Sequence, residues 1–241
     1  MKNLLVLSLG LVMIISCGQS GTSTDNNVAY DLVGVEFYKE FIPCVGGTDF
    51  NQESVANMMQ GWRSLNISDD LLGAWGYTPA TEESRFENGW WELQWESKED
   101  ADAAWNEWTQ DEEAMAFLAE HESVMVCNGD DRAGWDFTFH RDVASFGPLP
   151  EDGSFYTQFF PCKYNDGKSS DDLMESIALY NKWLDGLDAT GFYAYGIYAG
   201  DGSDELADFW WGNFHESADS ATTGNANWME SGGTVSYTHL R

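Results

Sequence analysis

The side chain with the widest chemical repertoire in this chain is His215. It is one of four histidines, with His121, His140 and His239, and it ends an aromatic run that is typical of a strand. An imidazole in such a place can ligate a metal or haem iron, or act as a general base. One titratable group without partners is not a mechanism, and a solvated or hydrogen-bonded histidine beside Glu216 explains the same residue. We therefore name His215 as the one catalytic candidate and assign no catalytic set.

Clusters of acidic residues raise the question of a metal site. They lie at Asp130-Asp131, at Asn165-Asp166 with Asp171-Asp172, and at Asp201 to Glu205. Carboxylates are the ligands that Ca²⁺ prefers, but the full EF-hand loop pattern is absent. In a chain with 41 Asp and Glu residues, such clusters also arise by chance. We assign no metal and no cofactor.

The net charge limits the possible partners. With 11 Lys and Arg against 41 Asp and Glu, the chain carries −30 at pH 7. Such a surface repels phosphate backbones, which excludes nucleic-acid binding, and it favours solubility in a salty medium. The chain is nevertheless 43% hydrophobic and 15% aromatic, which predicts a folded core.

These residues are set in an internal repeat. The segment FYKEFIPC at 37–44 returns as FYTQFFPC at 155–162. Further landmarks match in the same order: Trp62 with Trp183, Ala74-Trp75-Gly76-Tyr77 with Ala194-Tyr195-Gly196-Ile197, and Trp90-Trp91 with Trp210-Trp211. In this alignment His215 replaces Trp95, so one half has an imidazole where the other has an indole.

Each repeat alternates strands and helices. In the first, we predict strands over 35–45, 71–78, 90–96 and from 124, a helix after the turn at 46–49, and a second helix over 98–120 with Ser97 as its N-cap. In the second, we predict strands over 154–163, 191–199 and 206–214, a helix over 169–187 and another from Ser217.

This order resembles the ferredoxin-like βαββαβ unit. Both faces of the predicted strands are apolar, as at Trp90-Trp91 and Phe159-Phe160, so each sheet needs cover on its second face. The chain is therefore similar to the dimeric α/β-barrel superfamily: an α+β fold of two tandem ferredoxin-like repeats packed as an intramolecular barrel. Two independent domains are the alternative.

The chain start resembles a bacterial lipoprotein signal. Lys2 precedes an apolar run, and Ile14-Ile15-Ser16-Cys17 is similar to a lipobox, which implies acylation of Cys17. An ordinary secretory peptide is the alternative. Gly18 after the cysteine favours the outer membrane, so we expect an envelope protein held there by its lipid, with its oligomeric state open. We expect this organisation: 1–16 signal peptide, 17–27 flexible tether, 28–142 first repeat, 143–153 linker, 154–234 second, incomplete repeat, and 235–241 a non-native tail.

The ferredoxin-like arrangement implies a disulfide between Cys44 and Cys127, because the first and fourth strands are then antiparallel neighbours, and export permits the bond. Cys162 repeats Cys44, and we expect its partner in a strand that the second repeat lacks. Two free buried thiols are the alternative.

The strand aromatics define the candidate ligand site. If the sheets face each other, alternation places about half of these residues between them. We expect a small apolar or aromatic ligand there, lined by Trp75, Tyr77, Trp91, Trp95, Tyr195 and Trp211, although pure packing explains them too. The expected function is a non-catalytic exported lipoprotein. The alternative is an oxygenase-like or haem-binding enzyme of the α/β-barrel superfamily, with His215 as base or ligand.

Overall fold

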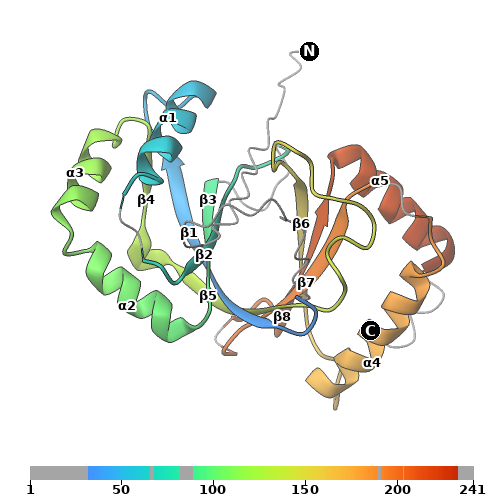
Figure 1. The fold of residues 1–241 in the computed structure, drawn as a ribbon. Helices are drawn as coiled ribbons and strands as arrows, with labels where there is room; N and C mark the ends of the chain where they lie inside the picture. Colours follow the sequence, from blue (N-terminus) through green and yellow to red (C-terminus); the bar gives the residue numbers. More distant parts are fainter. Residues whose placement is uncertain (1–31, 66–67, 82–88, 189–190, 203, 233–241) are drawn as a thin grey trace, which may run out of the picture. The chain divides into compact units, whose positions relative to one another are not determined.

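The structure is a computed structural model that describes residues 32–65, 68–81, 89–188, 191–202 and 204–232. Cys17, the expected signal peptide and tether, and His239 lie outside these residues. The described elements form a mixed α+β fold of antiparallel strands and five α-helices, consistent with a ferredoxin-like fold (Figure 1). They fall into two compact units: unit 1, described over Phe37–Gly134, and unit 2, described over 32–36 and 135–232. Within the described residues, no helix is long and apolar enough to cross a membrane.

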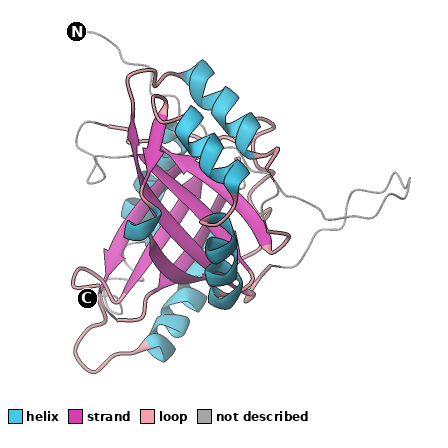
Figure 2. Cartoon of the chain, turned by 90° about the vertical axis from the view of Figure 1, so that its left-hand side faces the viewer, coloured by secondary structure: helices cyan, strands magenta, loops and turns pink. Residues whose placement is uncertain are grey.

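Unit 1 contains four strands and three helices. Its elements are β1 (Glu36–Gly46), α1 (Gln52–Trp62), β2 (Leu71–Tyr77), β3 (Gly89–Trp95), α2 (Lys98–Trp108), α3 (Glu112–Glu120) and β4 (Met125–Cys127). β3 pairs with β2 and β1, and β1 also pairs with β4, all antiparallel. The helices lie against the strands (Figure 2), and residues from both form one core that includes Ile42, Met58, Trp91 and Trp95.

The helix predicted over 98–120 is two helices in the structure. α2 ends at Trp108, and α3 begins after Asp111, whose carboxylate accepts hydrogen bonds from the backbone N–H groups of Glu113 and Ala114 at 2.8 and 2.9 Å. A new N-cap therefore restarts the helix. The predicted N-cap at Ser97 is confirmed, and the helix predicted from Ser217 is present, with Ser217 as its N-cap.

The predicted disulfide between Cys44 and Cys127 is confirmed. These cysteines face each other directly in the antiparallel pairing of β1 with β4. The bond closes a loop with a sequence separation of 83 residues. The disulfide therefore links β1 and β4, the first and last strands of unit 1, where they pair.

Unit 2 repeats the element order of unit 1 in part. It contains β5 (Ala133–Phe139), which starts at the end of unit 1, then β6 (Tyr156–Cys162), α4 (Ser170–Leu184), β7 (Tyr193–Ala199), β8 (Phe209–His215) and α5 (Ala218–Asn227), followed by a π-helical turn over Trp228–Gly232. β7 pairs with β5 and β8, and β8 pairs with β6, all antiparallel.

The boundary between the units differs from the expected linker at 143–153. The units divide after Gly134, and β5 joins unit 2 because it pairs with β7 over Asp136–Phe139. The expected linker contains Phe146, which is 8% exposed and packs on Leu184 and Tyr195 of unit 2. Phe146 of this segment is therefore part of the unit 2 core.

The match of residues 74–77 with 194–197 is shifted by one residue in the structure. Trp75 stands opposite Glu92 of β3, but its sequence match, Tyr195, stands opposite Asn213 of β8, whose counterpart on β3 is Leu93. The pairing of β2 has a register shift between Leu71 and Gly73 that displaces the strand. A one-residue shift sends a side chain to the other face of a sheet, so Tyr195 faces the helices and Trp75 faces away from them.

Candidate functional site

The candidate site is built on the helix-facing side of β8 in unit 2. Trp211, Asn213 and His215 occupy alternate positions of this strand and therefore share one face, about 7 Å apart from first to second and from second to third. Trp211 contacts Tyr180 of α4, whereas Phe214 contacts Phe159 on the other face. Alternation along one strand thus brings an indole, an amide and an imidazole under the helices.

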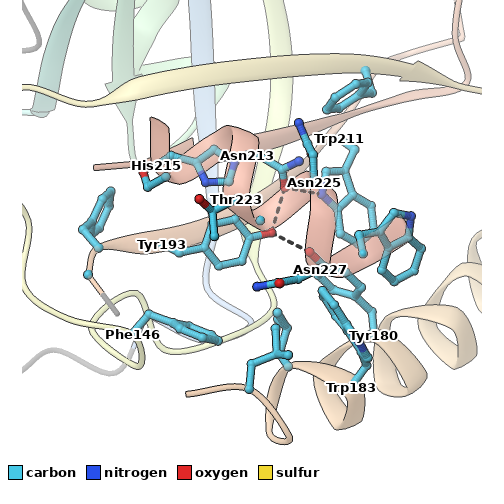
Figure 3. A pocket seen from close by; sticks show the side chains of 18 of the residues that line it. Phe146, Tyr180, Trp183, Tyr193, Trp211, Asn213, His215, Thr223, Asn225 and Asn227 are labelled. Atoms are coloured by element: carbon cyan, nitrogen blue, oxygen red, sulfur yellow. Dashed lines mark hydrogen bonds between the residues drawn. The ribbon is translucent and has the colours of Figure 1, made fainter. Parts of the chain in front are cut away.

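A cavity of about 700 Å³ lies over these three side chains, between β8, β7, α4 and α5 (Figure 3). Eight aromatic residues line it: Phe146, Phe160, Tyr180, Trp183, Phe192, Tyr193, Trp211 and Trp228. Its polar lining includes Asn213, His215, Thr223 and Asn225. This volume and this mixture of aromatic wall and few polar groups are typical of small-molecule sites.

His215 is neutral in this site. Only 5% of the residue is exposed, and burial lowers its pKa from 6.5 to about 4. Its Nε2 atom is buried and makes no hydrogen bond within the described part of the chain. The ring of Tyr193 packs at 4.9 Å from the imidazole, centroid to centroid, and Gly224 of α5 leaves space beside the ring's Cε1 and Nδ1 atoms. A buried polar atom without a partner is uncommon in native proteins and points to a function or a missing ligand.

A hydrogen-bonded chain crosses the cavity wall beside His215. The hydroxyls of Tyr180 and Tyr193 are 2.6 Å apart, and Tyr193 donates to Oδ1 of Asn213 at 2.9 Å (Figure 3). The indole N–H of Trp211 donates to the same oxygen at 2.8 Å. Burial raises the pKa of Tyr180 to about 12 and also raises that of Tyr193, so both phenols are protonated at neutral pH.

Unit 1 has a different chemistry at the equivalent positions. There the indoles of Trp95 and Trp105 donate to one buried carboxylate, Glu40, at 3.0 and 2.7 Å, and the Nε of Arg132 donates to it at 2.9 Å. In unit 1, β1 brings Glu40 opposite Leu93; in unit 2, β6 brings Gln158 opposite Asn213.

Three substitutions therefore separate the two sites. His215 stands in place of Trp95, Asn225 in place of Trp105 and Gln158 in place of Glu40. Asn225 still reaches Gln158, at 3.3 Å, as Trp105 reaches Glu40. Smaller polar side chains thus replace two indoles in unit 2. Unit 1 retains a cavity of about 720 Å³ beneath α1, α2 and α3, but there the polar atoms of Glu40 are satisfied internally.

The six predicted ligand-lining residues do not form one site. Trp91 and Trp95 belong to the helix-side core of unit 1, and Tyr195 and Trp211 belong to the helix side of unit 2. Trp75 and Tyr77 lie on the other face of the unit 1 sheet. We expected all six residues to share a surface between two sheets. This expectation is wrong for Trp91, Trp95, Tyr195 and Trp211, because the observed strand register turns their side chains toward the helices.

On that other face of unit 1 lies a buried ionic cluster. The Nζ atom of Lys39 is 2.8 Å from Oε1 of Glu92, and the hydroxyl of Tyr77 donates to Oε2 of Glu92. Lys39 also lies 4.6 Å above the ring of Trp75. Sequence reasoning missed this cluster, although alternation in β1 and β3 places both charged residues on the face opposite the helices.

The remaining candidate groups do not add to the site. Among the described residues no cluster of three His, Cys, Asp or Glu side chains could hold a metal ion. His121 packs on Phe117 in unit 1, and burial lowers the pKa of His140. Cys162 is a free thiol on the cavity wall, and burial raises its pKa to about 11, which makes it unreactive at neutral pH.

Sequence reasoning also missed Asn213, Tyr180 and Tyr193. A signal for the first was present: Trp211, Asn213 and His215 alternate along one strand, so a candidate at His215 implies that Asn213 lies on the same face. The tyrosines are recognisable only when the neighbouring strand and helix are placed.

Comparison with known proteins gives structural likeness only. No protein-family model matches the chain, and no curated protein matches it. Among solved structures it is similar to a chlorite dismutase from Candidatus Nitrospira defluvii in complex with imidazole, at 13% identity and TM-score 0.46, covering 85% of this chain and 86% of that chain. A mutant chlorite dismutase from the same organism in complex with cyanide gives 14% identity, TM-score 0.48 and coverage of 85% of each chain. Because both TM-scores are below 0.5, these likenesses carry no argument about the function of this chain.

Proposed function

We propose that unit 2 binds a flat, ring-shaped ligand between its sheet and helices α4 and α5, and that this ligand is a haem held by His215. The observation that carries the proposal is the imidazole itself. It is buried on the wall of a cavity of about 700 Å³, it is neutral at pH 7, and its Nε2 atom has no hydrogen-bond partner among the described residues.

The residues present fit a haem in two respects. A neutral imidazole is a common axial ligand of haem iron. The aromatic wall, with Tyr180 and Trp211 at right angles and Trp183 and Trp228 nearby, offers flat apolar surfaces of the kind that a macrocycle covers. Haem iron would supply redox chemistry and a position for a small ligand. His215 would hold the iron, and the aromatic wall would exclude water.

A second candidate is a ring compound without a metal. The specific observation in its favour is the charge of the lining: Asp188 and Asp219 belong to it, whereas none of the described lining residues is Lys or Arg. Haem carries two propionates, which such a rim does not attract. An uncharged aromatic ring meets no such opposition.

Titration of the purified protein with haem and with metal-free protoporphyrin tests both candidates. We expect a shifted Soret band with haem that is lost in His215→Ala and returns when imidazole is added. His121→Ala, which changes a histidine of unit 1, is the matched control and should leave the band unchanged.

The outcomes separate the candidates. Equal binding of haem and protoporphyrin, unaffected by His215→Ala, overturns the haem proposal and supports the metal-free ring. Failure of every ring to bind overturns the proposed function as a whole.

We also propose, from the sequence alone, that the protein is a lipoprotein of the outer membrane anchored through Cys17. The lipobox-like segment at 14–17 and the polar stretch after it support this. Such an anchor keeps the folded part at the membrane surface without a spanning helix.

A further inference from the structure

We propose that the cavity of unit 2 selects rings that carry an uncharged acceptor oxygen, and that Asn213 is the residue that recognises this oxygen. The inference deepens the proposed function, because it rests on the same cavity, but it does not require a metal in the ring.

The side-chain oxygen of Asn213 is already fully used. It accepts one hydrogen bond from Tyr193 at 2.9 Å and another from Trp211 at 2.8 Å. An amide oxygen has two lone pairs, so no acceptor position is left for a ligand. A hydroxyl or amine that approaches this amide therefore finds no acceptor.

The donor and acceptor roles along this hydrogen-bonded chain of side chains are fixed as well. Tyr193 has one hydroxyl proton, and it is given to Asn213. In the 2.6 Å contact between the two phenols, Tyr180 must then be the donor. Every proton of the chain points toward Asn213, so the chain stabilises one orientation of its amide and opposes a flip.

The amide nitrogen is the part of Asn213 that remains for a ligand. It makes no hydrogen bond to any residue within the described ranges, and the side chain is half-buried on the cavity wall. Two N–H donors are thus held at the cavity by two fixed partners. At Asn213 the cavity offers N–H donors and no acceptor, which favours a ligand oxygen that accepts at this position.

Charge decides which kind of oxygen is accepted. Asp188 and Asp219 line the same cavity, His215 is neutral at pH 7, and the chain carries −30. A carboxylate or phosphate would meet like charges there. No Lys or Arg is among the described lining residues, and Arg141, which lies over the ring of Phe146, is already paired with Asp185. A ketone, quinone or lactam oxygen on a flat ring meets the donors without that repulsion.

The equivalent position of unit 1 provides the natural variant. Leu93 stands there, opposite Glu40 as Asn213 stands opposite Gln158. Asn213→Leu therefore places in unit 2 a side chain that the same strand position already accommodates in unit 1. It removes the donors while keeping the branched shape and the four heavy atoms of the side chain.

Calorimetric titration with four fluorene derivatives tests the proposal. Fluorenone carries an acceptor, fluorene has no polar group, 9-fluorenol has a hydroxyl, and fluorene-9-carboxylate is an anion on the same ring. We expect the protein to bind fluorenone about three- to tenfold more tightly than fluorene, as one net hydrogen bond predicts. 9-Fluorenol should bind more weakly than fluorenone, and the carboxylate most weakly.

Two variants and a control make the test specific. Asn213→Leu should abolish the preference for fluorenone while fluorene binds as before. Tyr193→Phe frees one lone pair of the Asn213 oxygen, so 9-fluorenol should gain affinity relative to fluorenone. Asn106→Leu, which changes an exposed amide of α2 in unit 1, should leave the preference intact. Circular dichroism of each variant confirms that it is folded.

The outcomes are distinguishable from those of the proposed function. Equal binding of fluorenone and fluorene by the unmodified protein overturns the role of Asn213 and leaves ring binding in place. If the carboxylate binds most tightly, the proposed preference for an uncharged oxygen is overturned. If neither the fluorenes nor the porphyrins bind, the ring site itself is absent.

Discussion

Lys39 and Glu92 form an ion pair in which the Nζ and Oε1 atoms are 2.8 Å apart and the side chains are 4% and 0% exposed. Burial lowers the pKa of Lys39, and the charge and hydrogen bond of Glu92 oppose that shift. The pair therefore depends on both members, because one charge left alone in such a place is strongly unfavourable.

Glu92→Gln should lower the free energy of unfolding by about 3–5 kcal/mol, because it leaves the buried ammonium of Lys39 without its carboxylate. Urea denaturation measures this change. Lys168→Met, which breaks the exposed pair with Asp172, is the control and should have no measurable effect. A small loss in Glu92→Gln would mean that Lys39 is neutral in the folded protein.

His215 should make the stability depend on pH. Its pKa is about 4 in the folded protein and 6.5 when unfolded, so the unfolded chain binds the proton first as the pH falls. The stability is complete above pH 6.5 and declines between pH 6.5 and 4, by about 3 kcal/mol at most. Unfolding of His215→Gln at each pH supplies the reference. Parallel curves for the two proteins would show that the imidazole is solvated.

Removal of the disulfide with Cys44→Ala and Cys127→Ala should lower the stability by about 4 kcal/mol, because the bond closes a long loop. Guanidinium denaturation of the unmodified protein under reducing conditions should show a similar loss in the free energy of unfolding. In Cys162→Ala, the difference in unfolding free energy between oxidised and reduced protein should be the same as in the unmodified protein. Peptide mapping that joins Cys44 to Cys162 would contradict the pairing.

Cys17→Ala should release the exported protein from membranes into the soluble fraction, because the lipid on Cys17 is the proposed anchor. Cell fractionation and mass spectrometry of the N-terminus check this. Cys162→Ala, which removes a cysteine of the folded part, should remain with the membranes. Membrane association of Cys17→Ala would exclude the lipid anchor.

The order of elements was predictable because it depends on local patterns. Alternating aromatics mark β1 and β6, and Ser97 and Ser217 mark helix starts. The disulfide followed from this order, since it needs only that Cys44 and Cys127 lie on neighbouring antiparallel strands.

The orientation of the aromatics was not predictable from the same patterns. A register shift between Leu71 and Gly73 displaces β2 by one residue relative to β7, and one residue is enough to exchange the faces of a strand. Tyr195 therefore faces α4, although its sequence match, Trp75, faces away from the helices. The expectation that Tyr195 and Trp75 share one surface depended on the unshifted match.

The proposed selectivity of the cavity could not be predicted from the sequence. Asn213 looks like an ordinary polar residue until Tyr193, from the next strand, and Trp211 are seen to occupy its oxygen. Such a relationship depends on three side chains converging in space, and no spacing in the sequence encodes it.

The tyrosine chain also limits how protons can move in unit 2. It ends at the amide oxygen of Asn213, which holds no proton to pass on and is not basic at neutral pH. Burial raises the pKa values of Tyr180 and Tyr193, which opposes their ionisation. The hydrogen-bonded tyrosines therefore do not act as a proton relay. Acid–base chemistry on a bound ring would have to pass through His215, through the lining carboxylates of Asp188 and Asp219, or through water that enters the cavity.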